Sequence, residues 1–259
     1  MRRLILPEPI ERSAVWSRRV AIFALAVAAL AVALARAHAA SPGDSLIVFG
    51  SSLVLASLAA ALALAAAPPI WRDGRRGAEQ AALGAALATA LMAYPVYLAG
   101  KAFSSPPIND VSTDLKSPPR FLLTAKARQA RGGFDPPLPS EETLAAERAA
   151  YPDLATVRVR MDASEAYELA LDATSDLGWK LVDAAPPNAS SGGVGTIEAT
   201  DSSLFFGFPT DIVIRIRPET ADTAMDARAV SRVGRHDFGA GARRLRRFIA
   251  AAQEAAGDR

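Results

Sequence analysis

Two arginines, a serine and an aspartate stand close together near the C-terminus, at Arg228, Ser231, Arg232 and Asp237. Side chains alternate between the two faces of a strand, so we expect Arg228 and Arg232 to leave one face and Ser231 the other. A guanidinium group binds a carboxylate or a phosphate through two parallel hydrogen bonds. The arginines therefore predict one of three arrangements. They form an ion network with Asp237 or Asp211 that fixes the strand and its turn, they bind an anionic ligand, or they take part in catalysis.

A second polar group lies between the proline pairs at 106–107 and 118–119 and contains Asp110, Thr113 and Asp114. Such side chains accept hydrogen bonds from nearby backbone amides, which predicts a surface loop fixed by its own carboxylates. The alternative is that the loop helps to line a site. Together with the arginine run, the candidate ligand-binding residues are Asp110, Thr113, Asp114, Asp211, Arg228, Ser231, Arg232 and Asp237.

The common enzyme templates do not fit this chain. It has no cysteine and only two histidines, His38 and His236, so a serine triad would need Ser231, His236 and Asp237 to meet within one tight turn. The glycine-rich residues 191–196 lack the lysine of a phosphate loop and lead into a strand, which indicates a hairpin loop. We therefore predict no catalytic residues and no cofactor.

A metal site is not expected either. The side chains that could supply ligands are Asp110, Asp114, Asp211, His236 and Asp237. Their spacing along the chain matches no standard metal site, and we therefore predict none.

The elements that must position these residues follow from periodicity. Apolar residues alternate at 157–161, and further strands are expected at 179–184, 195–200, 211–217 and 225–233. Helical spacing predicts one helix that begins after Asp162 and ends at Gly178, a closing helix around Leu245 and Phe248, and a short helix that Ser140 caps. We expect an α+β domain with two helices on one face of a mostly antiparallel sheet of about five strands.

Three nearly uncharged apolar stretches, at 20–35, 46–67 and 81–100, fill the first part of the chain. Each is close to the ~17 to 25 residues that cross a bilayer as a helix. Small residues such as Gly50 and Gly84 predict close helix packing rather than transport chemistry. The expected organisation is a cytoplasmic tail (1–17), a three-helix membrane region (18–100), a proline-rich extended segment with a short helix (101–155) and an α+β extracytoplasmic domain (156–259).

Arginines set the expected orientation. They gather before the first stretch and between the second and third, whereas the turn between the first and second has only Arg36. Positive charge marks the cytoplasmic side, so the N-terminus is expected inside and the C-terminal domain outside the cytoplasm of an inner (plasma) membrane, in the periplasm or the extracellular space. The arginines that carry this prediction are Arg2, Arg3, Arg12, Arg18, Arg19, Arg72, Arg75 and Arg76. A signal peptide cleaved near Ala39 is the alternative, and it leaves the domain on the same side.

The chain resembles a known family in two places. The run from Arg228 to Gly239, and the residues Asn109 to Asp114 followed by the prolines at 118–119, are similar to the domain of unknown function 1499. The resemblance covers about residues 108–249, and some members also have three N-terminal spans. It implies a small domain associated with bacterial or plastid envelopes, without an established activity. Ala229 replaces the usual serine and Gly241 the usual asparagine, which weakens roles for those side chains.

The net charge of +2 lacks the concentrated basic surface that nucleic-acid binding needs. The expected partners are the lipid bilayer and an unknown anionic small molecule or envelope protein, with no nucleic acid. We expect a binding or accessory module of the envelope. The competing prediction is an envelope hydrolase that uses aspartates and arginines of the same cleft. A sensor is less favoured because the chain lacks a sizeable cytoplasmic domain.

Overall fold

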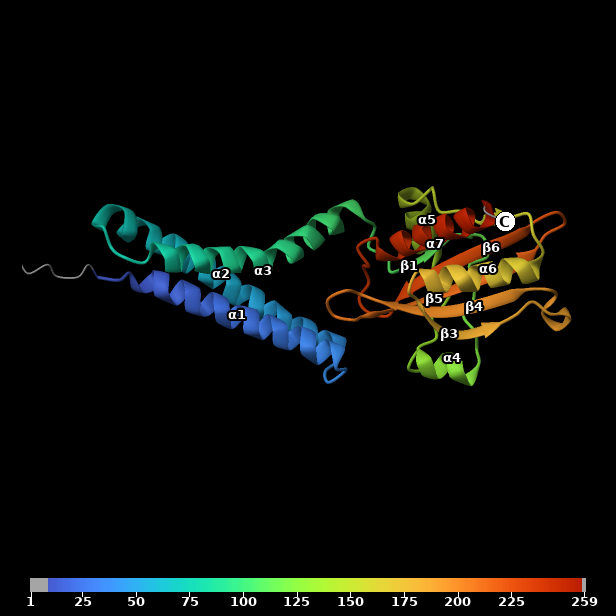
Figure 1. Cartoon of the computed structure of the whole chain (residues 1–259), viewed down its shortest axis with the longest axis horizontal. Coiled ribbons are helices and arrows are strands. Elements are labelled where there is room, and N and C mark those ends of the chain that lie inside the picture. Colours follow the sequence, from blue (N-terminus) through green and yellow to red (C-terminus); the bar gives the residue numbers. More distant parts are fainter. Residues whose placement is uncertain (1–8, 258–259) are drawn as a thin grey trace, which may run out of the picture. The chain divides into compact units, whose positions relative to one another are not determined.

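The computed structural model describes residues 9–257, so Arg2 and Arg3 lie outside the described residues. The chain forms two compact units, Met1–Gly100 and Lys101–Arg259. Figure 1 shows long helices in the first unit and a sheet with helices in the second.

Three helices in the first unit are long and apolar enough to cross a membrane: α1 (Arg12–Arg36), α2 (Pro42–Asp73) and α3 (Ala78–Ser104). They confirm the predicted spans, although each helix continues beyond its apolar stretch. Ser17 on α1 donates to the carbonyl of Ala59 on α2 at 2.9 Å. A Cβ atom added at Gly84 of α3 would lie 2.1 Å from the Ser17 hydroxyl, whereas one at Gly50 would meet nothing within 4 Å. Close packing therefore depends on Gly84 and not on Gly50.

The start of α1 and the turn between α2 and α3 lie together. Glu11 caps α1, and its carboxylate pairs with Arg75 at 2.8 Å. The Glu11 amide also donates to the carbonyl of Arg76 at 2.8 Å. The two arginine-rich segments of the first unit are therefore at the same end of the helices, as three successive crossings require.

The second unit is a six-stranded antiparallel sheet. Its strands are β1 (Asp110–Ser112), β2 (Val157–Val159), β3 (Lys180–Ala185), β4 (Gly195–Ser202), β5 (Pro209–Pro218) and β6 (Thr223–Ser231). The order is β1-β6-β5-β4-β3, and β2 also pairs with β6. The helices are α4 (Ala125–Ala130), α5 (Glu141–Ala150), α6 (Ala163–Asp176) and α7 (Ala240–Gly257), with a 3₁₀ turn at Ala189–Ser191. The predicted α+β class is confirmed.

Helices α6 and α7 cover one face of the sheet (Figure 1). The apolar positions of β5, such as Ile212 and Ile214, pack with Leu169 of α6 and Leu245 of α7 in the main core. Trp179 and Phe248 stack in the same core with ring centroids 6.2 Å apart. This face follows the alternation that the sequence predicts.

Residues 113–139, which we call the covering segment, lie over parts of the opposite face. Phe121 of this segment packs against Val213 of β5 and Val230 of β6. The alternation of apolar and polar residues along a strand such as 157–161 predicts that this face is exposed to solvent. The difference arises because the proline-rich segment folds back over the sheet. The predicted surface loop before it forms β1, an edge strand that pairs Asp110 with Val230.

Candidate functional site

Five charged residues on the covered face of the sheet are buried. They are Asp110 on β1, Glu198 on β4, Asp211 on β5, and Asp226 and Arg228 on β6. These residues alternate along the strands with the apolar core positions, so they leave the face opposite the core. A buried charge is costly unless it is paired and hydrogen-bonded. The partners of this buried ionic layer therefore decide what it can do.

Arg228 is 1% exposed, and all of its terminal nitrogens have partners. Its Nε and Nη2 atoms donate to the two carboxylate oxygens of Asp110 at 2.9 and 2.7 Å. Nη1 donates to the carbonyl of Pro119 at 3.3 Å, and Nη2 also donates to the carbonyl of Pro137. The guanidinium group thus joins β6, the edge strand β1 and both ends of the covering segment.

Arg232 forms a similar bidentate pair with Asp211. Its Nε and Nη2 atoms lie 2.7 and 2.6 Å from the carboxylate oxygens, and Nη2 also donates to the carbonyl of Ala130 at 3.1 Å. The Asp211 side chain is 1% exposed and that of Arg232 is 19% exposed. The Arg232 end of this pair is therefore partly exposed to solvent, and the Asp211 end is buried.

The covering segment contributes a third buried pair, between Arg131 and Glu198. The Leu122 amide donates to the other oxygen of Glu198 at 3.0 Å. Burial raises the pKa of Glu198, and the Arg131 partner opposes this shift. The guanidinium carbons of Arg131 and Arg228 both lie within 6 Å of the Phe121 ring centre, at 5.4 and 5.6 Å.

The other predicted site residues hold backbone rather than face one another. The Thr113 hydroxyl accepts from the Ala227 amide at 2.9 Å, and the Ser231 hydroxyl donates to the Val233 carbonyl at 3.3 Å. Asp237 accepts from the amides of Gly239 and Gly241 at 2.8 and 2.6 Å, at the start of α7. Of the two predicted partners of the arginines, Asp211 pairs with Arg232, whereas Asp237 accepts hydrogen bonds from the start of α7.

His236 does not form a triad with Ser231. Its Nδ1 atom accepts from the Phe238 amide at 3.0 Å, and its ring stacks on Phe238 with centroids 4.6 Å apart. Ser231 and Asp237 are engaged with backbone groups, as described above. Among residues 9–257, no three His, Asp or Glu side chains gather in a way that could hold a metal ion.

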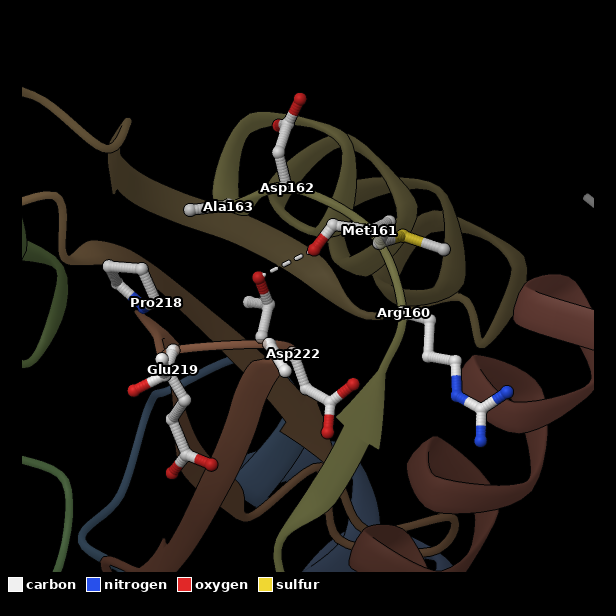
Figure 2. Close-up of a pocket in the computed structure, with 10 residues that line it drawn as sticks. Arg160, Met161, Asp162, Ala163, Pro218, Glu219 and Asp222 are labelled. Atoms are coloured by element: carbon white, nitrogen blue, oxygen red, sulfur yellow. Dashed lines mark hydrogen bonds between the residues drawn. The ribbon is translucent and has the colours of Figure 1, made fainter.

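An open pocket of about 540 Å³ lies at the hairpin between β5 and β6 (Figure 2). Arg160, Asp162, Glu219 and Asp222 are among its lining residues, and none of the eight predicted site residues is. Val230, which pairs with Asp110, is seven residues along β6 from the pocket residue Thr223. This spacing places the pocket roughly 23 Å from the Asp110 pair.

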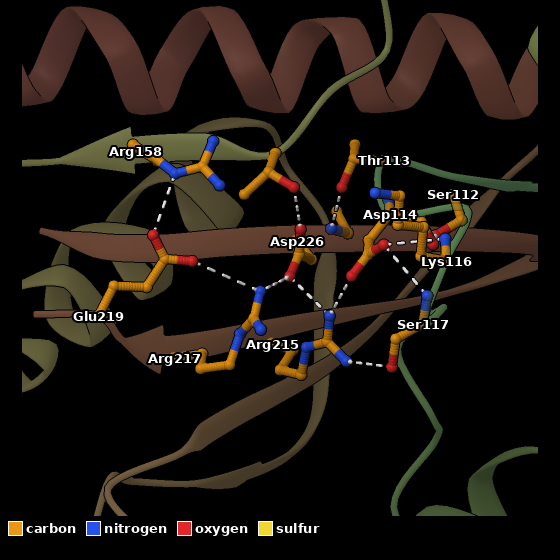
Figure 3. A network of polar contacts seen from close by, with 12 residues as sticks. Ser112, Thr113, Asp114, Lys116, Ser117, Arg158, Arg215, Arg217, Glu219 and Asp226 are labelled. Carbon is orange, nitrogen blue, oxygen red and sulfur yellow. Dashed lines mark hydrogen bonds and ion pairs between the residues drawn. The ribbon is translucent and has the colours of Figure 1, made fainter.

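A partly exposed charge network lies between the buried pairs and this pocket (Figure 3). The Nη2 atom of Arg215 donates to Asp114 at 2.9 Å and to Asp226 at 2.7 Å. Burial alone would raise the pKa of Asp114, but the amides of Ser117 and Lys116 and the Arg215 guanidinium outweigh it and lower that pKa. Asp114 is therefore held as a carboxylate by the amides of Ser117 and Lys116 and by Arg215 on β5, not by Arg228.

Glu147 of α5 is a buried acid that the sequence patterns do not predict. It is 1% exposed, and its Oε1 atom accepts from the Ser112 amide on the outer edge of β1 at 2.6 Å. Its Oε2 atom has no hydrogen-bond partner among the described residues. Burial raises its pKa to about 8, and the carboxylates of Asp110 and Asp237 add to this shift. The sequence holds one signal of this burial, because Glu147 follows apolar Leu144 by three residues and so lies on the same face of the helix.

The two departures from the family pattern lie at packed positions. Ala229 is 1% exposed and pairs with Val111 and Ile212 in the sheet. A Cβ atom added at Gly241 would lie 2.8 Å from the Asp237 carboxylate. A side chain at position 241 therefore requires a shift of the Asp237 carboxylate, and a side chain at position 229 lies in the main core.

The three candidate spans indicate a membrane anchor, and the antiparallel sheet with its helices and buried ionic layer gives an α+β domain. Together they define the class of this protein. Residues 110–251 match the family described as "Protein of unknown function (DUF1499)", and the chain belongs to this family. No curated protein matches the chain, and neither does any solved structure. The resemblance seen in the sequence is thus confirmed, while ligand binding by the eight residues stays a prediction.

Proposed function

We propose that the protein is a membrane-anchored accessory module of the cell envelope, which acts by binding an anionic small molecule or an envelope protein. The observation that carries this proposal is a division among the arginines. Arg131 and Arg228 are buried and connect the covering segment to the sheet. Arg217 and Arg158, at the edge of the same layer, have side chains that are 41% and 56% exposed.

Arg217 has spare capacity to bind an anion. Its Nη2 atom lies 3.5 Å from Asp226 and 3.7 Å from Glu219, which are longer than hydrogen bonds. Its Nε atom also has no hydrogen-bond partner among the described residues, but this atom is buried, so an anion would bind at the exposed end of the guanidinium group. An exposed guanidinium with unfilled donors fits a carboxylate or a phosphate. An anion at this position would compete with Glu219, which Figure 3 shows beside Arg217.

The contacts favour binding over the competing hydrolase. A hydrolase of this kind needs a carboxylate with an oxygen available to activate water. Both oxygens of Asp110 accept from Arg228, and both oxygens of Asp211 accept from Arg232. These carboxylates serve as internal partners of arginine and have little capacity left for proton transfer.

We further propose that the domain lies outside the cytoplasm, in the periplasm or the extracellular space, with the N-terminus inside an inner (plasma) membrane. The ion pair between Arg75 and Glu11 supports this orientation, because it gathers the arginine-rich segments at one end of the spans. Positive charge is retained on the cytoplasmic side of membranes.

The binding proposal is tested with the full chain in lipid nanodiscs. Thermal unfolding of the domain is followed while inorganic phosphate or succinate is added. We expect either anion to raise the midpoint temperature of the wild type and of the control Arg246→Ala, whose arginine pairs with exposed Asp153 elsewhere. Arg217→Ala should lose the increase. Equal increases in Arg217→Ala and the wild type would reject Arg217 as the binding residue, and no increase with either anion would reject a small anionic ligand.

A further inference from the structure

The loop between β4 and β5 (residues 203–208) carries no charge and is rich in large apolar side chains. Leu204 is 78% exposed and Phe205 is 43% exposed. Large apolar side chains that a domain presents together at its surface mark an interaction site rather than a solvated one.

This loop is held in a defined conformation. The Ser203 amide donates to the Phe208 carbonyl at 2.9 Å, and the Gly207 amide donates to the Ser203 carbonyl at 3.0 Å. The Phe208 amide also donates to the Ser203 hydroxyl at 2.9 Å. The rings of Phe206 and Phe208 stack with centroids 5.1 Å apart. The exposed pair at 204 and 205 is therefore carried by a folded turn and not by a loose chain.

The strand register places the loop at the end of the sheet where the chain arrives from α3. Thr200, Asp211, Val230 and Asp110 lie side by side across β4, β5, β6 and β1. Asp110 is the first residue of β1, and α3 ends at Ser104. Strand β4 is antiparallel to its neighbour β5, and it continues two residues past Thr200, to Ser202. The loop thus projects beyond the end of the sheet at which the chain enters.

The connection between α3 and β1 is short. Residues 105–109 span at most ~18 Å even when fully extended. Within the second unit, the His236 ring approaches the carbonyl of Ala102 in the last turn of α3 at 3.5 Å. Phe103 in that turn is 94% exposed. Exposed aromatic side chains at the end of a span are typical of the membrane interface.

We propose that the β4–β5 loop inserts Leu204 and Phe205 into the interface of the same bilayer that the helices span. The lipid surface fits the loop because the turn is apolar and uncharged, and because the short connection keeps this end of the sheet within reach of the membrane. The span and the loop would then hold the domain at two points. The β5–β6 hairpin and its pocket lie at the other end of the sheet, so they would face away from the lipid.

The absence of cysteine allows a direct test. A single Leu204→Cys variant of the full chain is labelled with an environment-sensitive dye and placed in nanodiscs whose lipids carry a quencher on the acyl chain. The control is Ala221→Cys, on the exposed tip of the β5–β6 hairpin. We expect quenching of the Leu204 label to be at least about threefold stronger, since interfacial side chains enter the headgroup and acyl boundary. Equal quenching at the two positions would overturn the proposal.

A second variant distinguishes lipid from protein. Phe205→Asp is added to Leu204→Cys, and the unfolding midpoint confirms that the domain remains folded. Insertion predicts that the charge removes most of the quenching. If the label is instead shielded from water without lipid quenching, and the shielding grows with the number of chains per disc, the loop binds a second copy of the chain and the proposal fails.

Discussion

At the residue scale, the Arg228–Asp110 pair predicts a large effect of removing one partner. Arg228→Ala leaves the buried Asp110 carboxylate without its bidentate donor. We expect the free energy of unfolding to fall by about 3–5 kcal/mol. The exposed pair of Arg246 with Asp153 is the control, and Arg246→Ala should cost no more than about 1 kcal/mol. Denaturant unfolding of the full chain in detergent, followed by the fluorescence of buried Trp179, measures both.

The double variant Arg228→Met with Asp110→Leu tests the cause. It replaces the pair by apolar side chains, so it should recover part of the stability that Arg228→Ala loses. If Arg228→Ala lowered the free energy of unfolding no more than Arg246→Ala does, Arg228 would not be a buried structural ion.

Glu147 predicts a pH dependence of stability. Burial raises its pKa from 4.5 to about 8, so the folded domain keeps a proton that the unfolded chain releases. Stability contributed by this group therefore falls as the pH rises through this window, by up to about 1.4 kcal/mol per pH unit, and levels off above it. Glu147→Gln should remove this slope. Unfolding midpoints at several pH values check it, with exposed Glu142→Gln as the matched control.

A slope that persists in Glu147→Gln, or that changes equally in Glu142→Gln, would assign the pH dependence to other groups. The charges of Asp110 and Asp237 raise the pKa of Glu147, and that of Arg228 lowers it. Replacing each of the two aspartates in turn by asparagine would then identify the group responsible.

At the scale of elements, Gly84 predicts how the spans pack. A Cβ atom there would lie 2.1 Å from the Ser17 hydroxyl and 2.8 Å from the Arg18 backbone nitrogen. Gly84→Ala must therefore push α3 away from α1, and we expect a loss of about 1–3 kcal/mol. Gly50→Ala meets nothing within 4 Å and should be neutral or slightly stabilising. Heat-induced loss of monodisperse protein in detergent compares the two, and equal behaviour would contradict the packing.

The elements also show which parts of the fold were predictable. Strands β4 to β6 and helices α6 and α7 follow local periodicity, so their existence could be read from spacing. Strand β1 has three residues between prolines and exists because β6 supplies its hydrogen bonds. The covering segment has little periodicity of its own, and only contact with the sheet decides its path.

At the scale of the whole molecule, three spans predict opposite sides for the two ends of the chain. Alkaline phosphatase joined after Arg259 should be active, because it folds only outside the bacterial cytoplasm. The same enzyme joined within the α2–α3 turn, after Gly74, should be inactive and serves as the control. Activity at Gly74 and none at Arg259 would reverse the proposed orientation and location.

The sequence by itself determined the three spans, the α+β class and the family, because hydropathy, strand alternation and the Arg228–Gly239 run are local patterns. The tertiary structure alone decided the partner of each arginine. Arg228 and Asp110 are 118 residues apart in the chain, and Arg232 selects Asp211 although Asp237 is nearer in sequence. It also decided that the charged face is covered and that Glu147 is buried at a strand edge. Pairing and burial depend on which distant segments meet, and no local pattern contains that information.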